Sequence, residues 1–278
     1  MADIATIANE LKSGKTVLYI GMGIFSGYSF SDGSSVPHDS DSIILAMNDG
    51  RPMAPRLMYE YARAAMSMEQ SRGRKYLEEK LKNIYKKEMQ KNSVHALIEK
   101  LMPRFVIDTN YDETLSKIYS GVPHFVIYGK ARIGASLDRF EIFEWSVEMG
   151  AYTKVEKELL SLDKPIIFKP MGGIAPEASL IVSDADFVDW LTEAMGGFAV
   201  PPVLKEYREG KKYLMLGLTF SKDTERMVAN EITIGLEGGY FASDLELVKN
   251  CTKYLASHKM EAINEEPNSL ARKLLELV

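Results

Sequence analysis

A Gly-x-Gly turn directly after an apolar segment is the first feature of this sequence that could do chemistry. Residues 16–20 are mostly β-branched or aromatic, which predicts a strand buried on both faces. Gly21 and Gly23 follow, and a backbone without Cβ can turn tightly and approach a ligand. In doubly wound sheets, such a turn presents backbone N–H groups to a phosphate or pyrophosphate. The competing interpretation is a buried strand closed by a tight turn, because Ser26 stands where a dinucleotide fingerprint has its third glycine.

Three further apolar segments end in turns with small or polar residues. Segment 105–107 leads into Thr109-Asn110-Tyr111-Asp112, segment 165–169 into Pro170-Met171-Gly172, and segment 212–216 into Gly217-Leu218-Thr219. In open α/β sheets, ligands bind outside the carboxyl ends of the strands, near the topological switch. We therefore expect all four turns to meet at one edge of a single sheet, where they would form a site.

Helical and strand patterns alternate along the chain, which predicts an α/β protein with a Rossmann-like, doubly wound parallel sheet. Strands are expected at 16–20, 105–107, 124–128, 165–169, 212–216, 232–236 and 260–263, with a hairpin near Phe140 and Ile142. Helices are expected at 2–13, 55–71, 74–91, 93–102, 151–162, 184–195, 201–209 and 244–257, through Leu115 and Ile118, and at the end of the chain. Residues 26–55 show no clear period, which predicts a long functional or partly ordered loop.

Composition excludes several classes of function. The 278 residues are 46% apolar and 26% charged, which is ordinary for a soluble globular protein. A net charge of −5 gives no sign of a nucleic-acid or membrane-surface binder. Cys251 is the one cysteine, so disulfides and cysteine-based zinc sites are excluded. The first residues lack the layout of a signal peptide and no apolar run reaches the length of a membrane span, so we expect a cytoplasmic protein.

Taken in order, the four turns resemble the motifs of the Sir2-like family. That family has Gly-Ala-Gly-x-Ser, Thr-Asn-Tyr-Asp, Lys-x-His-Gly, and Gly-x-Ser/Thr with a following Asp. The corresponding segments here are Gly21-Met22-Gly23-Ile24-Phe25, Thr109-Asn110-Tyr111-Asp112, Lys169-Pro170-Met171-Gly172, and Gly217-Leu218-Thr219 with Asp223. The closer match is to the bacterial branch without a zinc ribbon, the Sir2-like NAD hydrolases. The resemblance covers roughly residues 14–265 and implies a single Rossmann domain over 1–278 with a helical insertion at 55–102.

The resemblance implies NAD as the substrate or ligand and gives roles to the turn residues. Asn110 is expected beside the ribose that carries nicotinamide, because an amide donates and accepts hydrogen bonds while uncharged. Asp112 is expected as the second catalytic residue, although capping of the next helix explains it equally well. Backbone groups of the first turn would face the pyrophosphate, and the fourth turn would border the adenosine half, with Ser221 equally explained as a helix N-cap. The residues expected to bind the cofactor are Gly21, Met22, Gly23, Ile24, Phe25, Thr109, Met171, Gly172, Gly217, Thr219 and Ser221.

Three positions depart from the family pattern. Met171 stands where the family has its catalytic histidine, and a thioether cannot take a proton from the ribose. The loss of a positioned general base typically lowers the rate by about 10²–10⁴-fold. Met22 and Phe25 stand where the family has alanine and serine, and both are expected to narrow the pocket. The pattern therefore predicts the family fold with absent or altered NAD chemistry.

No other histidine replaces Met171 in an obvious way. His38 lies in the long loop after the first strand and is the one expected near the strand ends, while His95 and His258 fall in helical patterns. His124 begins the third strand and therefore lies at the opposite edge. Three acidic residues follow the fourth strand, and capping explains one of them, Asp184, most simply; the others are Glu177 and Asp186. No His/Asp/Glu spacing resembles a metal site.

Three functions remain open on this reading. The first is an enzyme that cleaves NAD or transfers its ADP-ribose. The second is a binding protein for a small nucleotide with weak, altered or absent NAD glycohydrolase activity, and this is the interpretation we favour. The third is a scaffold subunit without a pocket. The methionines Met58, Met66 and Met68 could serve a homo-oligomer interface, although core packing is the commoner use of such residues.

Overall fold

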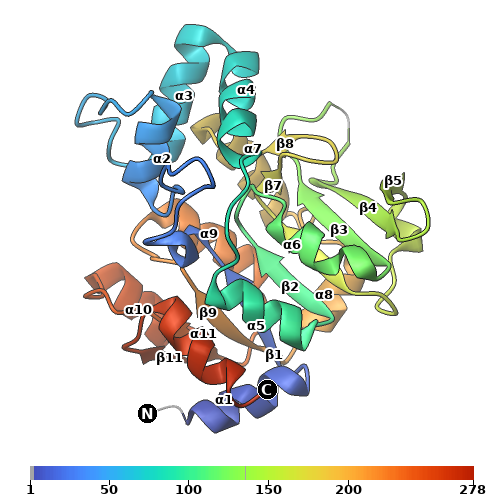
Figure 1. The fold of residues 1–278 in the computed structure, drawn as a ribbon. Helices are drawn as coiled ribbons and strands as arrows, with labels where there is room; N and C mark the ends of the chain where they lie inside the picture. The colour runs from blue at the N-terminus through green and yellow to red at the C-terminus, as the bar shows by residue number, and fades with distance from the viewer. Residues whose placement is uncertain (1–2, 135) are drawn as a thin grey trace.

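The computed structural model describes residues 3–134 and 136–278 and is built around a sheet flanked by helices (Figure 1). Among the described residues, this sheet has nine strands in the order β11-β10-β9-β1-β2-β6-β3-β4-β5. The strands are β1 (Thr16–Ile20), β2 (Phe105–Asp108), β3 (His124–Gly129), β4 (Phe140–Ser146), β5 (Ala151–Val155), β6 (Ile166–Lys169), β9 (Lys212–Leu216), β10 (Gly239–Ala242) and β11 (Met260–Ile263). A short antiparallel pair, β7 (Gly172–Gly173) and β8 (Ser179–Leu180), stands apart from the sheet.

Strand β1 is the centre of the topology. All pairs from β11 across to β3 are parallel, and β4 and β5 extend one edge as an antiparallel hairpin. Leu18 of β1 lies between Val106 of β2 and Leu214 of β9. The chain builds the β2–β6–β3 side before the β9–β10–β11 side, so the order reverses at β1. The predicted Rossmann-like α/β architecture is confirmed, with the topological switch at β1.

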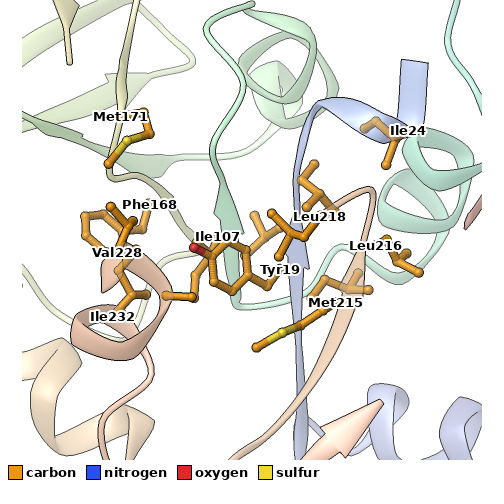
Figure 2. Close-up of a cluster of buried hydrophobic side chains, with 14 of the residues drawn as sticks. Tyr19, Ile24, Ile107, Phe168, Met171, Met215, Leu216, Leu218, Val228 and Ile232 are labelled. Atoms are coloured by element: carbon orange, nitrogen blue, oxygen red, sulfur yellow. The ribbon is translucent and has the colours of Figure 1, made fainter. Parts of the chain in front are cut away.

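Helices interleaved with the strands cover the sheet (Figure 1). They are α1 (Ile4–Lys12), α2 (Ser40–Met47), α3 (Tyr61–Arg72), α4 (Arg74–Tyr85), α5 (Ser93–Leu101), α6 (Thr114–Ile118), α7 (Asp184–Met195), α8 (Pro202–Arg208), α9 (Asp223–Ile232), α10 (Lys249–Ser257) and α11 (Pro267–Leu275), with 3-10 turns η1 (Met22–Phe25), η2 (Tyr119–Gly121) and η3 (Lys157–Leu159). All five residues of β1 are buried, as its unbroken apolar run predicted. Figure 2 shows the core around Tyr19, where side chains of β1, β2, β6, β9 and α9 meet.

Two predicted elements are wrong. The expected helix at 151–162 is strand β5 followed by η3, because residues 151–155 pair with β4, with Val155 opposite Ile142. The expected strand at 232–236 does not form, since Ile232 ends α9 and is buried with Val228 on one helical face. The strand lies later, at β10, where a Cβ on Gly239 would come within 2.1 Å of the Tyr213 carbonyl oxygen. Pairing with the neighbouring strand β4 overrode the helical pattern at 151–155, and burial of one face of α9 overrode the strand pattern at Ile232.

The long segment after β1 is more ordered than its composition predicted. Residues 40–47 form α2, whose capping box joins the Asp39 carboxylate to the Ser42 amide and the Ser42 hydroxyl to the Asp39 amide. Such reciprocal capping stabilises a short helix start. Helix α3 then begins at Tyr61, later than the expected 55, α4 ends at Tyr85, before the expected 91, and α10 begins at Lys249 rather than at 244.

Helices α2, α3 and α4 pack on one another above the carboxyl edge of the sheet, and α3 also contacts α7 (Figure 1). Asp186 of α7, 1% exposed, joins these parts. Its carboxylate lies 2.6 Å from Nη1 of Arg74 on α4 and 2.8 Å from Nε of Arg132 in the β3–β4 loop. It also accepts the backbone N–H groups of Val182 and Ser183, so Ser183 rather than Asp184 is the N-cap of α7. Helix α5 packs instead on α11, and the division into a domain with an insertion stays a prediction.

Candidate functional site

A pocket of about 230 Å³ opens at the carboxyl ends of four adjacent strands, β9, β1, β2 and β6. Each of the four turns contributes one residue that directly follows its strand or comes within two residues of it: Met22, Thr109, Met171 and Gly217. Helices α2, α3, α7 and α9 supply the remaining walls. The four turns therefore meet at one edge, at the switch point, as expected from the sequence.

The turn residues divide into two groups around this pocket. Those that line it are Met22, Thr109, Met171, Gly217, Thr219 and Ser221. Those that lie behind or beside the lining are Gly21, Gly23, Ile24, Phe25, Asn110, Asp112 and Gly172. Of the two large residues expected to narrow the pocket, Met22 lines it, whereas Phe25 is 1% exposed and packs against the His95 ring at 5.7 Å. Residues 22–25 form the 3-10 turn η1, and in this conformation the Phe25 side chain is buried in the core.

The glycines of the first and fourth turns allow two backbones to approach closely. A Cβ on Gly21 would lie 2.7 Å from the Gly217 carbonyl oxygen, and one on Gly23 would lie 2.9 Å from the Gly217 Cα. The Gly21 amide donates to the Leu216 carbonyl, and the Gly23 amide donates to the Gly217 carbonyl, both at 2.9 Å. These two N–H groups are thus engaged inside the fold. Contact with a pyrophosphate stays a prediction for Gly21 and Gly23, and it requires their amides to change partners.

Two buried asparagines hold the first turn from the opposite side. The side-chain amides of Asn92 and Asn268 each donate to the Ile24 carbonyl at 2.9 Å, and both residues are 3% exposed. Asn92 caps α5, and Asn268 lies in the first turn of α11. The turn after β1 is therefore clamped to two helices that come from distant parts of the chain.

We expect Asn268→Asp to destabilise the protein by about 1–3 kcal/mol, the range for a buried hydrogen-bond partner left unsatisfied. The substitution keeps the shape of the side chain but replaces a donor to the Ile24 carbonyl with an oxygen. Urea unfolding measures the loss. The matched control is Asn230→Asp on the exposed side of α9, which should change stability little.

A buried ion pair between Asp108 and Lys169 supports the Thr-Asn-Tyr-Asp turn. Asp108, the last residue of β2, has one carboxylate oxygen 2.6 Å from Lys169 Nζ and accepts the Asn110 backbone N–H with the other at 2.9 Å. Asp112 accepts the Thr114 backbone N–H at 2.8 Å at the start of α6, but the N-cap of that helix is Glu113, so the N-cap role considered for Asp112 is wrong. Burial raises the pKa of Asp108, and the Lys169 ammonium opposes that rise.

Asn110 and Asp112 do not share the pocket with Met171. Asn110 is 4% exposed, and within residues 3–134 and 136–278 its side-chain nitrogen has no hydrogen-bond partner. Asp112 faces a separate hollow of about 140 Å³ that it shares with Tyr85 and Lys117. Thr109 alone of this turn reaches the main pocket, and its hydroxyl and its amide both donate to the Ile20 carbonyl. The two residues expected to be catalytic are therefore adjacent to the pocket wall rather than on its surface.

His95 is the histidine that the structure brings to this turn, whereas the sequence pointed to His38. His38 precedes the pocket residues at the start of α2, but its own ring lies against the Val36 carbonyl and does not line the pocket. His95 of α5 is 1% exposed, and burial lowers its pKa to about 4 despite the nearby Asp112 carboxylate. The helical pattern could not predict that His95 lies near Asp112, because such a pattern shows which face of a helix is buried but not which element packs against it.

Protonation of His95 should make stability depend on pH. Its pKa is about 6.5 in the unfolded chain and about 4 in the folded one, so only the unfolded state binds this proton between those values. Lowering the pH from 7 to 4 is therefore expected to reduce the free energy of unfolding by about 3 kcal/mol through His95. Urea unfolding at a series of pH values measures this. His95→Gln should remove that part of the slope, while His258→Gln, at the end of α10, should leave it.

Acidic and hydroxyl side chains form the α9 side of the pocket. The Glu225 carboxylate accepts the Thr219 backbone N–H at 3.0 Å and its hydroxyl at 2.9 Å, and burial raises the pKa of Glu225. The Ser221 hydroxyl pairs with that of Thr219, and the N-cap of α9 is Lys222, so the N-cap role considered for Ser221 is wrong. Across the pocket, the Thr224 hydroxyl bonds to the carboxylate of Glu60 before α3.

Comparison with models of known protein families found a match over the second part of the chain. A model described as SIR2-like domain matches residues 104–263, more than half of the chain. The chain belongs to the SIR2-like family. The match begins at β2 and takes in the turns at Thr109, Met171 and Gly217, whereas β1 and its glycine turn precede it. No curated protein matched the chain.

The SIR2-like family implies NAD-related binding or hydrolysis, and the pocket of this SIR2-like chain offers groups that suit part of such a ligand. Tyr19, Phe187 and Val228 form apolar walls, while Thr219 and Glu225 supply polar atoms. Its volume of about 230 Å³ falls below the ~300–1,000 Å³ of common ligand clefts. Among the described residues, no cluster of three or more His, Cys, Asp or Glu could hold a metal ion, and no helix is long and apolar enough to cross a membrane.

Proposed function

We propose that this SIR2-like protein binds NAD or ADP-ribose at the carboxyl edge of its sheet and has weak or no NAD glycohydrolase activity. The observation that carries the proposal is the single pocket reached by all four turns at the topological switch.

The walls suit a nucleoside held by its ring and its sugar. A flat base is accommodated by Tyr19, Phe187 and Val228 through apolar contact. The hydroxyl groups of a ribose can donate to the carboxylates of Glu60 and Glu225, which keep free acceptor positions. In this proposal, Thr219 and Ser221 border the adenosine half, and Asn110 shifts from behind the pocket wall to face the ribose that carries nicotinamide.

Weak cleavage of NAD is expected because of Met171, which lies two residues after β6. By resemblance, Met171 occupies the position of the family histidine, and it is 4% exposed within the buried cluster that also holds Phe168 and Val228 (Figure 2). A thioether sulfur cannot accept a proton at neutral pH, so a ribose hydroxyl or a water molecule is not activated there. Among the described residues, no histidine lines this pocket in its place.

The tight pocket also favours one alternative, a scaffold that keeps the fold without binding a nucleotide. Thermal unfolding separates the two functions, because a ligand at about one hundred times its dissociation constant adds roughly 2.7 kcal/mol of stability. We expect NAD and ADP-ribose to raise the unfolding temperature. NADP serves as a third ligand, and failure of all three to stabilise the protein would establish the scaffold alternative.

Release of free nicotinamide from NAD measures the second half of the proposal. We expect slow or undetectable release by the parent protein. Fast turnover that Asn110→Ala abolishes, but that the matched surface variant Asn230→Ala leaves intact, would instead make the protein an active NAD hydrolase despite Met171.

A further inference from the structure

Lys169 and Asp108 form an ion pair that no role described so far explains. Lys169 ends β6 and is 1% exposed, and its Nζ lies 2.6 Å from the carboxylate of Asp108 at the end of β2. The two strands run parallel with Ile107 beside Phe168, so the following residue of each meets the other. Gly173 leaves room first for the Tyr128 ring and then for the lysine stem, because a Cβ there would lie 2.8 Å from Tyr128 Cε1 and 3.3 Å from Lys169 Cε. Sheet register and a glycine thus place the pair.

Asp108 connects this ammonium group to Asn110. The carboxylate oxygen that does not contact Lys169 accepts the Asn110 backbone N–H at 2.9 Å. The backbone of Asn110 is therefore fixed by a carboxylate that Lys169 itself holds. The side-chain nitrogen of Asn110 has no hydrogen-bond partner in the described part of the chain, although the residue is 4% exposed. A buried donor left unpaired is costly, and a ligand that accepts from it would account for its retention.

The ammonium group of Lys169 favours the ionised form of the two carboxylates beside this turn, Asp108 and Asp112. Asp112 also lies within the field of Lys169, which, with His95 and Thr114, lowers the pKa of Asp112 against the effect of burial. His95 is neutral near pH 7 because burial lowers its pKa to about 4. Burial keeps Tyr85 neutral as well, since it raises the pKa of that phenol. Loss of the lysine charge would remove the ammonium group that favours the ionised form of both Asp108 and Asp112.

We propose that Lys169 is a positioning residue, which acts through Asp108 to hold the backbone of Asn110 and so fixes its side-chain amide behind the wall of the nucleotide pocket. The nature of the ligand rests on the proposed function. The coupling of Lys169 to Asn110 rests on the ion pair and the hydrogen bond alone, so it can be tested without any ligand.

NMR of the free protein tests the coupling. The side-chain amide signal of Asn110, assigned by its loss in Asn110→Ala, should move in Lys169→Met, and exchange of the Asn110 backbone amide should become about tenfold faster or more. The matched control is Lys164→Met, which removes a lysine paired with Glu144 just before β6 and should leave the Asn110 signals in place. An unmoved Asn110 signal in folded Lys169→Met overturns the proposal.

If Lys169→Met does not fold, the double variant Lys169→Met/Asp108→Asn removes both charges, and replacing a whole buried pair is tolerated far better than breaking it. The Asn110 signal is again expected to move, because the lysine no longer holds its neighbour. An Asn110 signal identical to that of the parent protein would again refute the coupling.

Calorimetric titration with ADP-ribose adds the functional readout. Lys169→Met should weaken binding about tenfold in the parent protein but less than about twofold in the Asn110→Ala background, because a residue that acts through Asn110 has nothing left to act on. Equal losses in both backgrounds would mean a merely structural role and overturn the proposal. If the parent protein binds neither ADP-ribose nor NAD, the proposed function is refuted instead, while the NMR comparison still decides the coupling.

Discussion

Met171→His should raise the rate of nicotinamide release from NAD by about 10²–10⁴-fold, the usual contribution of a positioned general base. Met171 lines the pocket where β6 ends, and by resemblance this is the position of the family histidine. The site is apolar and 4% exposed, which disfavours a charged imidazolium. The new histidine would therefore stay neutral near pH 7 and be able to take a proton.

The control for this gain is Met171→Leu, which keeps an apolar side chain of similar size and should leave the rate at the parent level. Asn110→Ala added to Met171→His should remove the gain if Asn110 faces the reacting ribose. No increase in a folded Met171→His protein would show that the pocket is blocked elsewhere. Met22 is then the side chain to shorten, because it lines the same pocket and stands where the family has alanine.

Asp186→Ala should destabilise the protein by about 3–5 kcal/mol, the range for breaking a buried ion pair by removing one partner. The carboxylate is 1% exposed and holds Arg74, Arg132 and two backbone N–H groups at the start of α7. Its removal leaves the Val182 and Ser183 amides without their acceptor and breaks the ion pairs of Asp186, while Glu69 still accepts from Arg74 and Arg132. Chemical denaturation measures the loss, and faster hydrogen exchange in α3 and α4 would localise it.

The matched variant Asp186→Asn retains an acceptor without the charge and should cost less. Burial opposes ionisation of Asp186, but the amides of Ser183 and Val182 and the Arg74 guanidinium outweigh it and lower its pKa. A carboxyl with a lowered folded pKa contributes stability above its unfolded pKa, near 4, and loses it as the pH falls further. The difference between the parent protein and Asp186→Asn should therefore shrink below about pH 4. A difference that persists unchanged at pH 2 would contradict the assignment of the charge.

Helix α7 connects these two predictions, because it carries Asp186 and also lines the pocket that contains Met171. Phe187 follows Asp186 on α7 and lines the pocket, and Tyr61 of α3 packs edge-on to it at 6.1 Å. Loosening the Asp186 contacts should therefore disturb the pocket wall as well as the fold. We expect the affinity for ADP-ribose to fall in Asp186→Ala more than in Asp186→Asn.

Much of the architecture was determined by local sequence. The apolar runs of β1, β2, β3, β6 and β9 are buried on both faces of a parallel sheet, and such strands need no partner-specific pattern to be recognised. The turns that follow them were found from glycine and polar residues alone. Because parallel strands all end at the same edge, their convergence on one pocket followed from topology without any coordinates.

Tertiary structure alone decided which turn residues face the pocket. Asn110 and Phe25 lie on turns identified from sequence, yet Asn110 stands behind the wall and Phe25 packs on His95. Strand β5 was mistaken for a helix because its pairing with β4, not its own pattern, sets its conformation. The pairing of Lys169 with Asp108 joins residues 61 positions apart. Contacts of that kind depend on how strands align and helices dock, which the order of residues in one segment does not encode.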